Sequence, residues 1–341
     1  MLCKIYNGKI YRKKCLVIEV TNGDSLKLFV QIPCLNEEKT ILQVLETIPK
    51  RIDGIDSIEI LIIDDGSQDR TIELSERFGV KHFVKHAKNM GLARSFHDGV
   101  HYALSHGADI VVNTDGDNQY PQERIGDLVQ PILRGKAEIV IADRQTQTIE
   151  HFSAIKKVFQ RLGSAVVNKA AGTELPDAAS GFRAYSKESL LRLNIVTAFS
   201  YCMETIIQAG HKRIPIETIQ IKTNAKTRES RLFKSIWQHM FKSASAIIKS
   251  YIMYRPHLIF ISLGIFLLIC GIIPFIRYAV IFTMGDRGDH IQSLLLGAVL
   301  LFASMIAFAL SVISDIISTS RTLQEDALER LKRMQYSHVD K

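Results

Sequence analysis

The sequence predicts an α/β fold, a largely parallel sheet covered by helices on both faces, followed by an amphipathic helix and a two-helix transmembrane hairpin. From residue 28 onward, short apolar runs typical of buried strands alternate with helical patterns. Near the C-terminal end, two apolar segments are each long enough to cross a bilayer. Polar and acidic residues follow directly after several of the predicted strands, where parallel sheets bind their ligands.

The strand–helix alternation defines the order of the elements. The predicted strands are Leu28–Ile32, Ile58–Ile63, His82–Val84, Ile110–Val112 and Ile139–Ala142. The predicted helices are Lys39–Ile48, Thr71–Phe78, Leu92–Ser105 and Glu123–Leu133. The strand ends read IPCLNEE, IIDDGSQD, TDGDNQ and ADR, and the chain has neither a GxGxxG nor a Walker lysine motif. Dinucleotide and P-loop chemistry are therefore disfavoured.

Two uncharged apolar segments, Leu258–Ile276 and Leu294–Ile313, have 19 and 20 residues and predict membrane spans. The alternative is a pair of core helices of a soluble protein. Basic residues lie outside the pair on both sides, so the positive-inside bias predicts that both termini are cytosolic. The protein is then an integral membrane protein, of the plasma membrane if the source is bacterial or archaeal, and the spans could also support a homo-oligomer.

The segment before the first span has apolar residues at steps of three and four from Leu232 to Ile252, with lysines on the opposite face. This pattern predicts an amphipathic helix in the headgroup plane, with packing against the globular domain as the alternative. Eight basic residues against one acid lie between Lys222 and Arg255, a net +7 that accounts for nearly all of the net charge of +8. We expect membrane lipids as a partner, and no nucleic acid.

The stretch TDGDNQYP raises the main chemical question. In extended backbone, Asp115, Asp117 and Gln119 would point the same way. Two converging carboxylates repel each other unless a cation lies between them. The alternative is a polar turn, since Asp, Gly and Asn are common turn residues.

Five motifs, VQIPCLNEE, LIIDDGSQDRT, KNMGLARS, TDGDNQYP and DAASGFRAYSKES, occur in this order. Together they resemble the family 2 inverting glycosyltransferases of GT-A fold, and more narrowly dolichol-phosphate-mannose synthase and bacterial polyprenyl-phosphate sugar transferases. The resemblance covers about residues 28–232. It departs from the family pattern at Leu35, where an aromatic residue often faces the nucleobase, and it leaves residues 1–27 uncovered.

The resemblance implies a nucleotide-sugar donor site with Mg²⁺ or Mn²⁺ as cofactor. Asp117 and the Gln119 carbonyl are the expected metal ligands, with Asp115 at the diphosphate or ribose. Asp65 would contact the base or ribose, although an Asp-Gly turn with Asp69 capping the next helix is the alternative. The remaining donor-site residues are Pro33, Leu35, Asn36, Glu37, Asp64, Asn89, Gly91, Gly116, Arg144 and Lys157. Asn89 has a helix N-cap as its alternative role.

The acceptor site follows from phosphate chemistry. A phosphate monoester is already anionic at neutral pH, so it needs cations to hold it rather than a strong general base. The expected acceptor-phosphate residues are Ser180, Arg183, Lys226, Arg228 and Arg231. The last three could instead bind anionic lipid headgroups. Asp177 is expected either to steady the acceptor loop or to act as a weak base. The expected catalytic residues are Asp115, Asp117, Asp177 and Arg183.

The predicted function is metal-dependent, inverting transfer of one hexose from a nucleotide sugar, GDP- or UDP-linked, to a polyprenyl phosphate at the cytosolic membrane face. Two alternative functions are sugar transfer to a growing polysaccharide and sugar transfer to a non-lipid acceptor. A third is a non-enzymatic role as a scaffold. A polysaccharide synthase is disfavoured because the chain has two predicted spans and lacks a QxxRW motif. The predicted divisions are an extension of unknown role at 1–27, a GT-A domain at 28–228 and an interfacial helix at 229–255. Two spans (about 258–280 and 291–316) follow within 256–317, with a cytosolic tail at 318–341.

Overall fold

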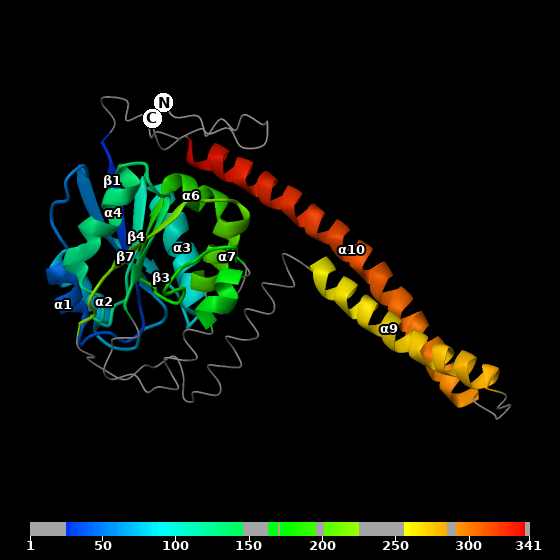
Figure 1. Ribbon diagram of the computed structural model, residues 1–341. Coiled ribbons are helices and arrows are strands. Elements are labelled where there is room, and N and C mark those ends of the chain that lie inside the picture. The colour runs from blue at the N-terminus through cyan, green and yellow to red at the C-terminus, as the bar shows by residue number, and fades with distance from the viewer. Residues whose placement is uncertain are drawn as a thin grey trace. The chain divides into compact units, whose positions relative to one another are not determined.

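The computed structural model describes residues 25–145, 163–169, 171–195, 201–224, 256–284 and 291–337. The chain forms two compact units (Figure 1): Met1–Ser243 together with Lys332–Lys341, and Ala244–Leu331. Most of the predicted N-terminal extension and the whole predicted interfacial helix at 229–255 lie outside the described residues.

A sheet of seven strands among the described residues forms the centre of the first unit (Figure 1). The strands are β1 (Lys27–Cys34), β2 (Ser57–Asp64), β3 (His82–Lys85), β4 (Ile110–Asn113), β5 (Ile139–Asp143), β6 (Arg183–Ser186) and β7 (Ile216–Gln220), in the order β3-β2-β1-β4-β6-β5-β7. The pairs β1–β2, β1–β4, β2–β3 and β5–β7 are parallel, and β6 is antiparallel to both β4 and β5. All five predicted strands are therefore confirmed, while β6 and β7 are additional.

Helices cover both faces of this sheet. They are α1 (Ile41–Thr47), α2 (Thr71–Phe78), α3 (Leu92–Ser105), η1 (Gln122–Arg124), α4 (Ile125–Leu133), α6 (Lys187–Arg192) and α7 (Tyr201–His211). Side chains alternate along β1: Leu28 and Val30 join the hydrophobic cluster of α1 and α4, whereas Gln31 faces α3 at Gly99. Helices α1 and α4 thus lie on one face and α3 and α7 on the other (Figure 1).

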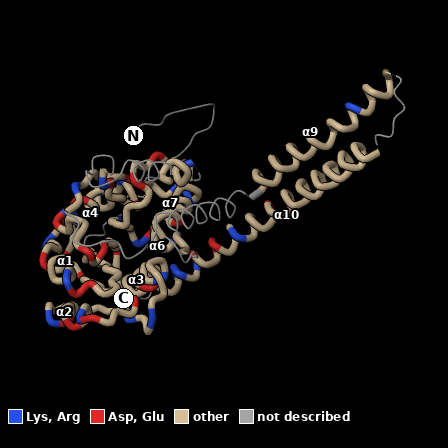
Figure 2. Tube along the Cα trace, turned by 90° about the horizontal axis from the view of Figure 1, so that it is seen from below, with Lys and Arg blue, Asp and Glu red and all other residues tan. Residues whose placement is uncertain are grey.

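The second unit contains two long apolar helices, α9 (Pro256–Thr283) and α10 (Ile291–Tyr336). The last residues of α10, from Lys332 onward, belong to the first unit. The 18-residue windows that qualify them as candidate membrane spans are 11% and 22% buried. Large apolar side chains such as Phe266 and Phe302 are exposed, which contradicts a soluble core helix and agrees with the predicted membrane anchor. Charged residues are sparse along α9 and the first part of α10 (Figure 2).

Small residues bring α9 and α10 together. The Ser304 hydroxyl donates to the Gly264 carbonyl oxygen at 2.8 Å, and an added Cβ on Gly271 would lie 3.0 Å from the Leu301 side chain. Close packing through small residues is typical of helix pairs in lipid. The second predicted span and the following residues up to Tyr336 form one continuous helix, α10, without a break at residue 317.

We expect Gly210→Ala to lower the stability of the first unit by about 2 kcal/mol or more. A Cβ on Gly210, in α7, would lie 2.0 Å from the backbone oxygen of Ala171, so one of the two segments must move. The matched control is Gly126→Ala in α4, whose Cβ would meet only Ile52 at 3.9 Å and which should be neutral or slightly stabilising. Thermal unfolding of both purified variants checks this, and equal melting temperatures would contradict the close packing.

Candidate functional site

Three loops meet beyond the carboxyl ends of β1, β2 and β4. The Thr40 hydroxyl donates to the Gly116 carbonyl oxygen at 2.7 Å, which joins the β1 loop to the TDGD loop. The backbone N–H of Asn36 donates to the Ser67 hydroxyl at 2.9 Å, and the Gln68 N–H donates to the Asn36 side-chain oxygen at 2.7 Å. The structure therefore brings together the VQIPCLNEE, DDGSQD and TDGDNQ motifs, as the sequence predicts.

The β1 loop is shaped by its own polar contacts. Asn36 adopts a left-handed backbone conformation with φ of 56°, and Pro33 and Leu35 are half-buried beside it. Glu37 is buried, and its carboxylate accepts from the Thr40 hydroxyl at 3.2 Å. Glu37 therefore contributes to the loop's internal structure, and its predicted contact with the donor stays a prediction.

Asp65 organises the loop that carries Asn89 and Gly91. Its carboxylate accepts from the backbone N–H groups of Met90 at 2.8 Å and Gly91 at 2.9 Å. A ring nitrogen of His86 lies 2.8 Å from the same carboxylate. Asp65 thus connects β2 to the start of α3, and its predicted contact with the base or ribose stays a prediction.

The sequence also allows local structural roles, as alternatives, at three positions of these loops: an Asp-Gly turn after β2, a helix cap at Asp69 and a helix N-cap at Asn89. The Asp64 carboxylate accepts from the Ser67 N–H at 3.0 Å, which forms the turn expected of an Asp-Gly sequence. Asp69 accepts from the N–H of Thr71, the first residue of α2, at 3.0 Å. An N-cap role for Asn89 is wrong, because Gly91 occupies the N-cap position of α3 and Asn89 is exposed.

The TDGDNQ loop is a turn, so the extended backbone expected for it is wrong. Asn118 has a φ of 57°, and this left-handed residue folds Gln119 back onto Asp117. The Gln119 side-chain amide donates to the Asp117 carboxylate at 2.8 Å, and the Gln119 backbone N–H donates to it at 3.2 Å. Asp117 and Gln119 are therefore adjacent because of the turn.

Asp115 lies on the acceptor side of this turn, apart from the Asp117–Gln119 pair. A Cβ added to Gly181 would lie 3.5 Å from an Asp115 carboxylate oxygen. Gly116, between the two acids, packs so closely that an added Cβ would lie 3.0 Å from the Cys34 sulfur. Burial and then the nearby carboxylates, Glu37 first, raise the pKa of the Cys34 thiol well above its usual value. The loop can therefore carry two acids in separate directions.

The donor set at Asp117 and Gln119 fits a hard divalent cation that is shared with a ligand. No group of three His, Cys, Asp or Glu side chains that could hold a metal occurs in the described part of the chain. Mg²⁺ typically takes one or two carboxylates from a protein and completes its shell with phosphate oxygens and water. Asp117 is only half-buried and supplies one such carboxylate beside an amide.

Arg144 and Asp177 form a bidentate ion pair at the rear of the site. The guanidinium donates to the two carboxylate oxygens at 2.7 and 3.0 Å, and the Asp177 side chain is 1% exposed. Burial alone raises the pKa of Asp177, but the charge and hydrogen bonds of Arg144 outweigh burial and hold this pKa below its usual value. Asp177 is therefore held in an ion pair within the loop at residues 177–183, which we call the acceptor loop after its predicted role, and that role stays a prediction.

Arg183, the first residue of β6, is fully buried beneath this loop. Its guanidinium donates to the carbonyl oxygens of Ser180, Ala178 and Cys202 at 2.6, 2.9 and 2.9 Å. It also donates to the Thr205 hydroxyl at 3.0 Å. Contact with an acceptor phosphate would require some of these bonds to break, so the predicted phosphate role stays a prediction. Ser180 is also buried, and its hydroxyl has no hydrogen-bond partner within the described residues.

Sequence reasoning missed a buried polar network under the same loop. The Asn113 side-chain amide donates to the Gly181 carbonyl oxygen at 3.0 Å and to the Tyr201 hydroxyl at 2.8 Å. The Gly181 N–H donates to the Tyr120 hydroxyl at 3.0 Å. Burial raises the pKa of both tyrosines above the usual value, so both phenols are neutral at physiological pH. Tyr120 had a sequence signal, since it belongs to TDGDNQYP, whereas Tyr201 belongs to none of the five motifs.

Four of the basic residues predicted to contact phosphate lie outside the described residues. These are Lys157, Lys226, Arg228 and Arg231. Asn224, the last described residue before Lys226, donates its backbone N–H to the Gln119 carbonyl oxygen at 3.0 Å. Its side-chain amide donates to the Asn118 carbonyl oxygen at 3.1 Å. The chain therefore contacts the TDGDNQ turn at Asn224, two residues before Lys226.

We expect Asp177→Asn to destabilise the protein by about 3 kcal/mol at neutral pH, because Arg144 loses a buried partner. The folded-state pKa of Asp177 lies below the usual 3.8, so its stabilisation is present above about pH 4 and is lost as the pH falls through the folded-state pKa. Melting temperatures of wild type and variant between pH 3 and pH 8 check this, with the exposed Asp53→Asn as the control. A difference that disappears between pH 7 and pH 5 would assign the effect to another group.

The chain is 28% identical over 217 residues to the UDP-N-acetylglucosamine–dolichyl-phosphate N-acetylglucosaminyltransferase of Methanococcus voltae, which covers 58% of this chain and 85% of that protein. It is 27% identical over 226 residues to the dolichol-phosphate mannosyltransferase of Pyrococcus furiosus, covering 63% of this chain and 62% of that protein.

Among solved structures, the glucosyl-3-phosphoglycerate synthase of Mycobacterium tuberculosis, in complex with Mn²⁺, UDP and glucosyl-3-phosphoglycerate, has a TM-score of 0.52 at 21% identity. The match covers 67% of this chain and 79% of that one, and it shows the GT-A fold. Residues 29–193 match the family described as Glycosyl transferase family 2. Residues 29–193, just under half of the chain, therefore form a glycosyltransferase domain of the family 2 type.

Proposed function

We propose that the protein transfers one hexose, with inversion, from a nucleotide sugar to a polyprenyl phosphate at the cytosolic face of a membrane. The observation that carries this proposal is the Arg144–Asp177 pair. The only acid that the sequence suggested as a base is bound at both oxygens by a guanidinium, and its pKa is lowered. An acceptor that is already ionised, such as a phosphate monoester, suits a site with so weak a base.

Two further findings support a lipid phosphate as acceptor. The exposed apolar helices α9 and α10 would keep the enzyme at the membrane that holds such a lipid. Both archaeal relatives have names that specify dolichyl phosphate, although they name different sugars. The acceptor class is therefore better supported than the donor, for which UDP- and GDP-linked hexoses are both candidates.

On the donor side, Pro33, Leu35, Asn36 and the two acids Asp64 and Asp65 would surround the nucleoside. Asp115, Gly116, Arg144 and Lys157 would lie along the diphosphate. Asp117 and the Gln119 carbonyl would hold Mg²⁺ or Mn²⁺, which neutralises negative charge on the departing nucleoside diphosphate when it is bound.

On the acceptor side, Asp177, Ser180 and Arg183 would fix the loop that receives the acceptor. The guanidinium of Arg183 is already committed to this loop, so we assign the acceptor phosphate mainly to Lys226, Arg228 and Arg231. A phosphate oxygen of the lipid then attacks the anomeric carbon, and the bond from that carbon to the nucleoside diphosphate breaks on the opposite face.

A panel of labelled UDP- and GDP-sugars, incubated with the purified protein and polyprenyl phosphate, tests this function. We expect one donor to yield a glycosylated polyprenyl phosphate and free nucleoside diphosphate, with inverted anomeric configuration. Transfer to a sugar acceptor, with none to the lipid phosphate, would contradict the proposal.

We expect Asp117→Asn to reduce turnover by about a hundredfold or more with little change in melting temperature. The carboxylate is half-buried and contributes little to the core, whereas loss of a metal ligand weakens stabilisation of the leaving group. Asp127→Asn is the matched control, because Asp127 lies on α4 and is half exposed beside Arg124. Near wild-type transfer by Asp117→Asn, together with full activity in chelator, would remove the metal assignment.

We expect Arg228→Gln to raise the KM for polyprenyl phosphate at least about tenfold, while the KM for the nucleotide sugar changes little. Arg228→Lys should also be impaired, because a single ammonium group cannot reproduce the two-pronged contact of a guanidinium. The assay uses neutral detergent, in which headgroup binding by basic residues makes no contribution. Small and equal effects of neutralising Lys226, Arg228 and Arg231 would indicate a headgroup role instead.

A further inference from the structure

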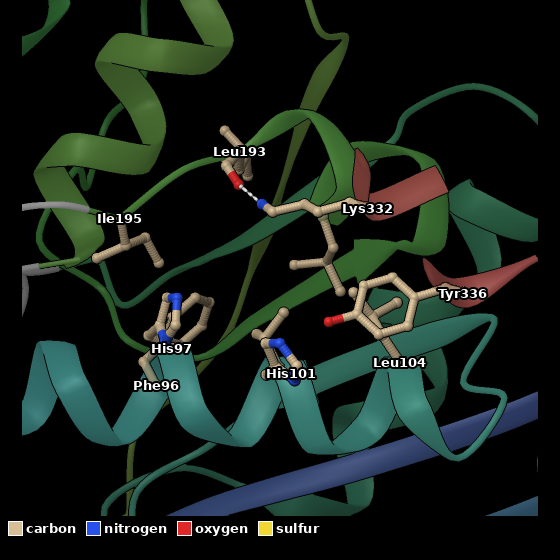
Figure 3. Close-up of a pocket in the computed structure, with 10 residues that line it drawn as sticks. Phe96, His97, His101, Leu104, Leu193, Ile195, Lys332 and Tyr336 are labelled. Atoms are coloured by element: carbon tan, nitrogen blue, oxygen red, sulfur yellow. Dashed lines mark hydrogen bonds between the residues drawn. The ribbon is translucent and has the colours of Figure 1, made fainter. Parts of the chain in front are cut away.

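The C-terminal residues of α10 pack against α3 and the end of α6 within the first unit, where together they line a pocket (Figure 3). The pocket is lined by Phe96, His101, Leu104, Leu193, Lys332 and Tyr336, among others. Tyr336 is 3% exposed, and its ring lies against that of His101, with centroids 5.6 Å apart and planes at 76°. In Figure 3 the Tyr336 ring lies over α3 near Leu104.

Two charged residues fix the same segment to α6. The Lys332 ammonium donates to the Leu193 carbonyl oxygen at 2.7 Å, directly after the last residue of α6. The Arg333 guanidinium makes a two-pronged contact with the Glu188 carboxylate, one bond being 2.9 Å. Contacts of three different kinds thus define a single seat for the segment, which we call the C-terminal clasp (residues 332–336).

The clasp is connected to the acceptor loop through one aromatic stack. Phe96, which lines the pocket, stacks on Tyr201 with centroids 4.0 Å apart and planes at 8°. The Tyr201 hydroxyl donates to the Gly181 carbonyl oxygen at 3.2 Å and accepts from Asn113. The pocket that Tyr336 lines is therefore separated from the Gly181 backbone by two aromatic rings, those of Phe96 and Tyr201.

The donor side of α3 is held separately. Gly91, at the N-cap of α3, donates its N–H to Asp65 at 2.9 Å, and this contact is independent of the clasp. A change at Tyr336 should therefore reach the acceptor loop through Phe96 and Tyr201 while the nucleotide-binding loops stay in place.

We propose that Tyr336 is a positioning residue for transfer: the C-terminal clasp holds α3 so that Phe96 supports Tyr201, and Tyr201 fixes the acceptor loop at Gly181. This inference rests on the proposed function only where it assigns the loop to the acceptor. A chain segment that follows the membrane helices thereby contributes to the geometry of the catalytic site.

Tyr336→Ala, Tyr336→Phe and Met334→Ala test the clasp in the full-length protein. Met334 is the matched control, since it lies on the same turns of α10 and is 68% exposed. We expect Tyr336→Ala to raise the KM for polyprenyl phosphate at least about fivefold with an unchanged Kd for the nucleotide sugar. Tyr336→Phe, which keeps the ring, should restore most of the loss.

A double-mutant cycle adds the intermediate residue. If the effect passes through the stack, Phe96→Leu should produce the same kinetic change, and the double variant with Tyr336→Ala should be little worse than either single variant. Additive losses would overturn the proposed route.

Amide hydrogen exchange gives a readout that needs no catalysis. We expect exchange in residues 178–183 of Tyr336→Ala to accelerate at least about fivefold, with unchanged exchange in residues 64–70. Unchanged exchange at 178–183, or an equal acceleration throughout the domain, would overturn the inference. If the wild-type protein transfers no hexose to polyprenyl phosphate, the proposed function fails, and the exchange experiment still decides the role of the clasp.

Discussion

The buried side chain of Asn113 constrains the whole catalytic end of the domain. Its carbonyl accepts from Gln31 of β1 at 2.9 Å, and its amide donates to Gly181 and Tyr201. A buried amide group left without a partner costs about 1–3 kcal/mol, so the end of β4, the acceptor loop and α7 must keep their relative positions. Because the TDGD loop leaves the sheet at the next residue, this constraint also places the acids of the donor site.

The acidic loops are stable next to one another because most of their charges meet hydrogen-bond donors. Asp65 accepts from two backbone N–H groups, and Asp117 accepts from Gln119. Asp115 points toward the acceptor loop, where its charge adds to burial in raising the pKa of Tyr201. The carboxylates of Asp65, Asp115 and Asp117 therefore point in different directions instead of forming one cluster. Asp117 stays accessible at the turn.

Two arginines near the acceptor loop, Arg144 and Arg183, differ in the groups to which they donate hydrogen bonds. Arg144 meets a carboxylate, so the pair is neutral overall and removes a possible base. Arg183 meets carbonyl oxygens and a hydroxyl, so its positive charge remains buried under the loop without a carboxylate partner among its hydrogen bonds. An acceptor that brings its own negative charge, as in the proposed function, is compatible with both arrangements.

Local pattern was sufficient for part of the regular structure. Apolar runs identified β1 to β5, and the 19- and 20-residue uncharged segments identified the long apolar stretches of α9 and α10, because apolar residues follow one another where a strand is buried or a helix is suited to lipid. The sequence pattern also identified the loops that carry Asp65, Asp117 and Arg144, because ligand sites in parallel sheets lie at the carboxyl ends of the strands.

Contacts between distant residues were decided only by the tertiary structure. Strand β6 reads Arg-Ala-Tyr-Ser and is buried at each position, so it has neither the apolar run that identified β4 and β5 nor an alternation of polar and apolar faces. The turn at Asn118, the neutralisation of Asp177 by Arg144 and the burial of Arg183 each depend on side chains that the fold brings together. The seat of Tyr336 on α3 joins residues more than 200 positions apart in the sequence. Sequence patterns encode which face of an element is apolar, whereas the partner of a polar group is set by where the folded backbone places it.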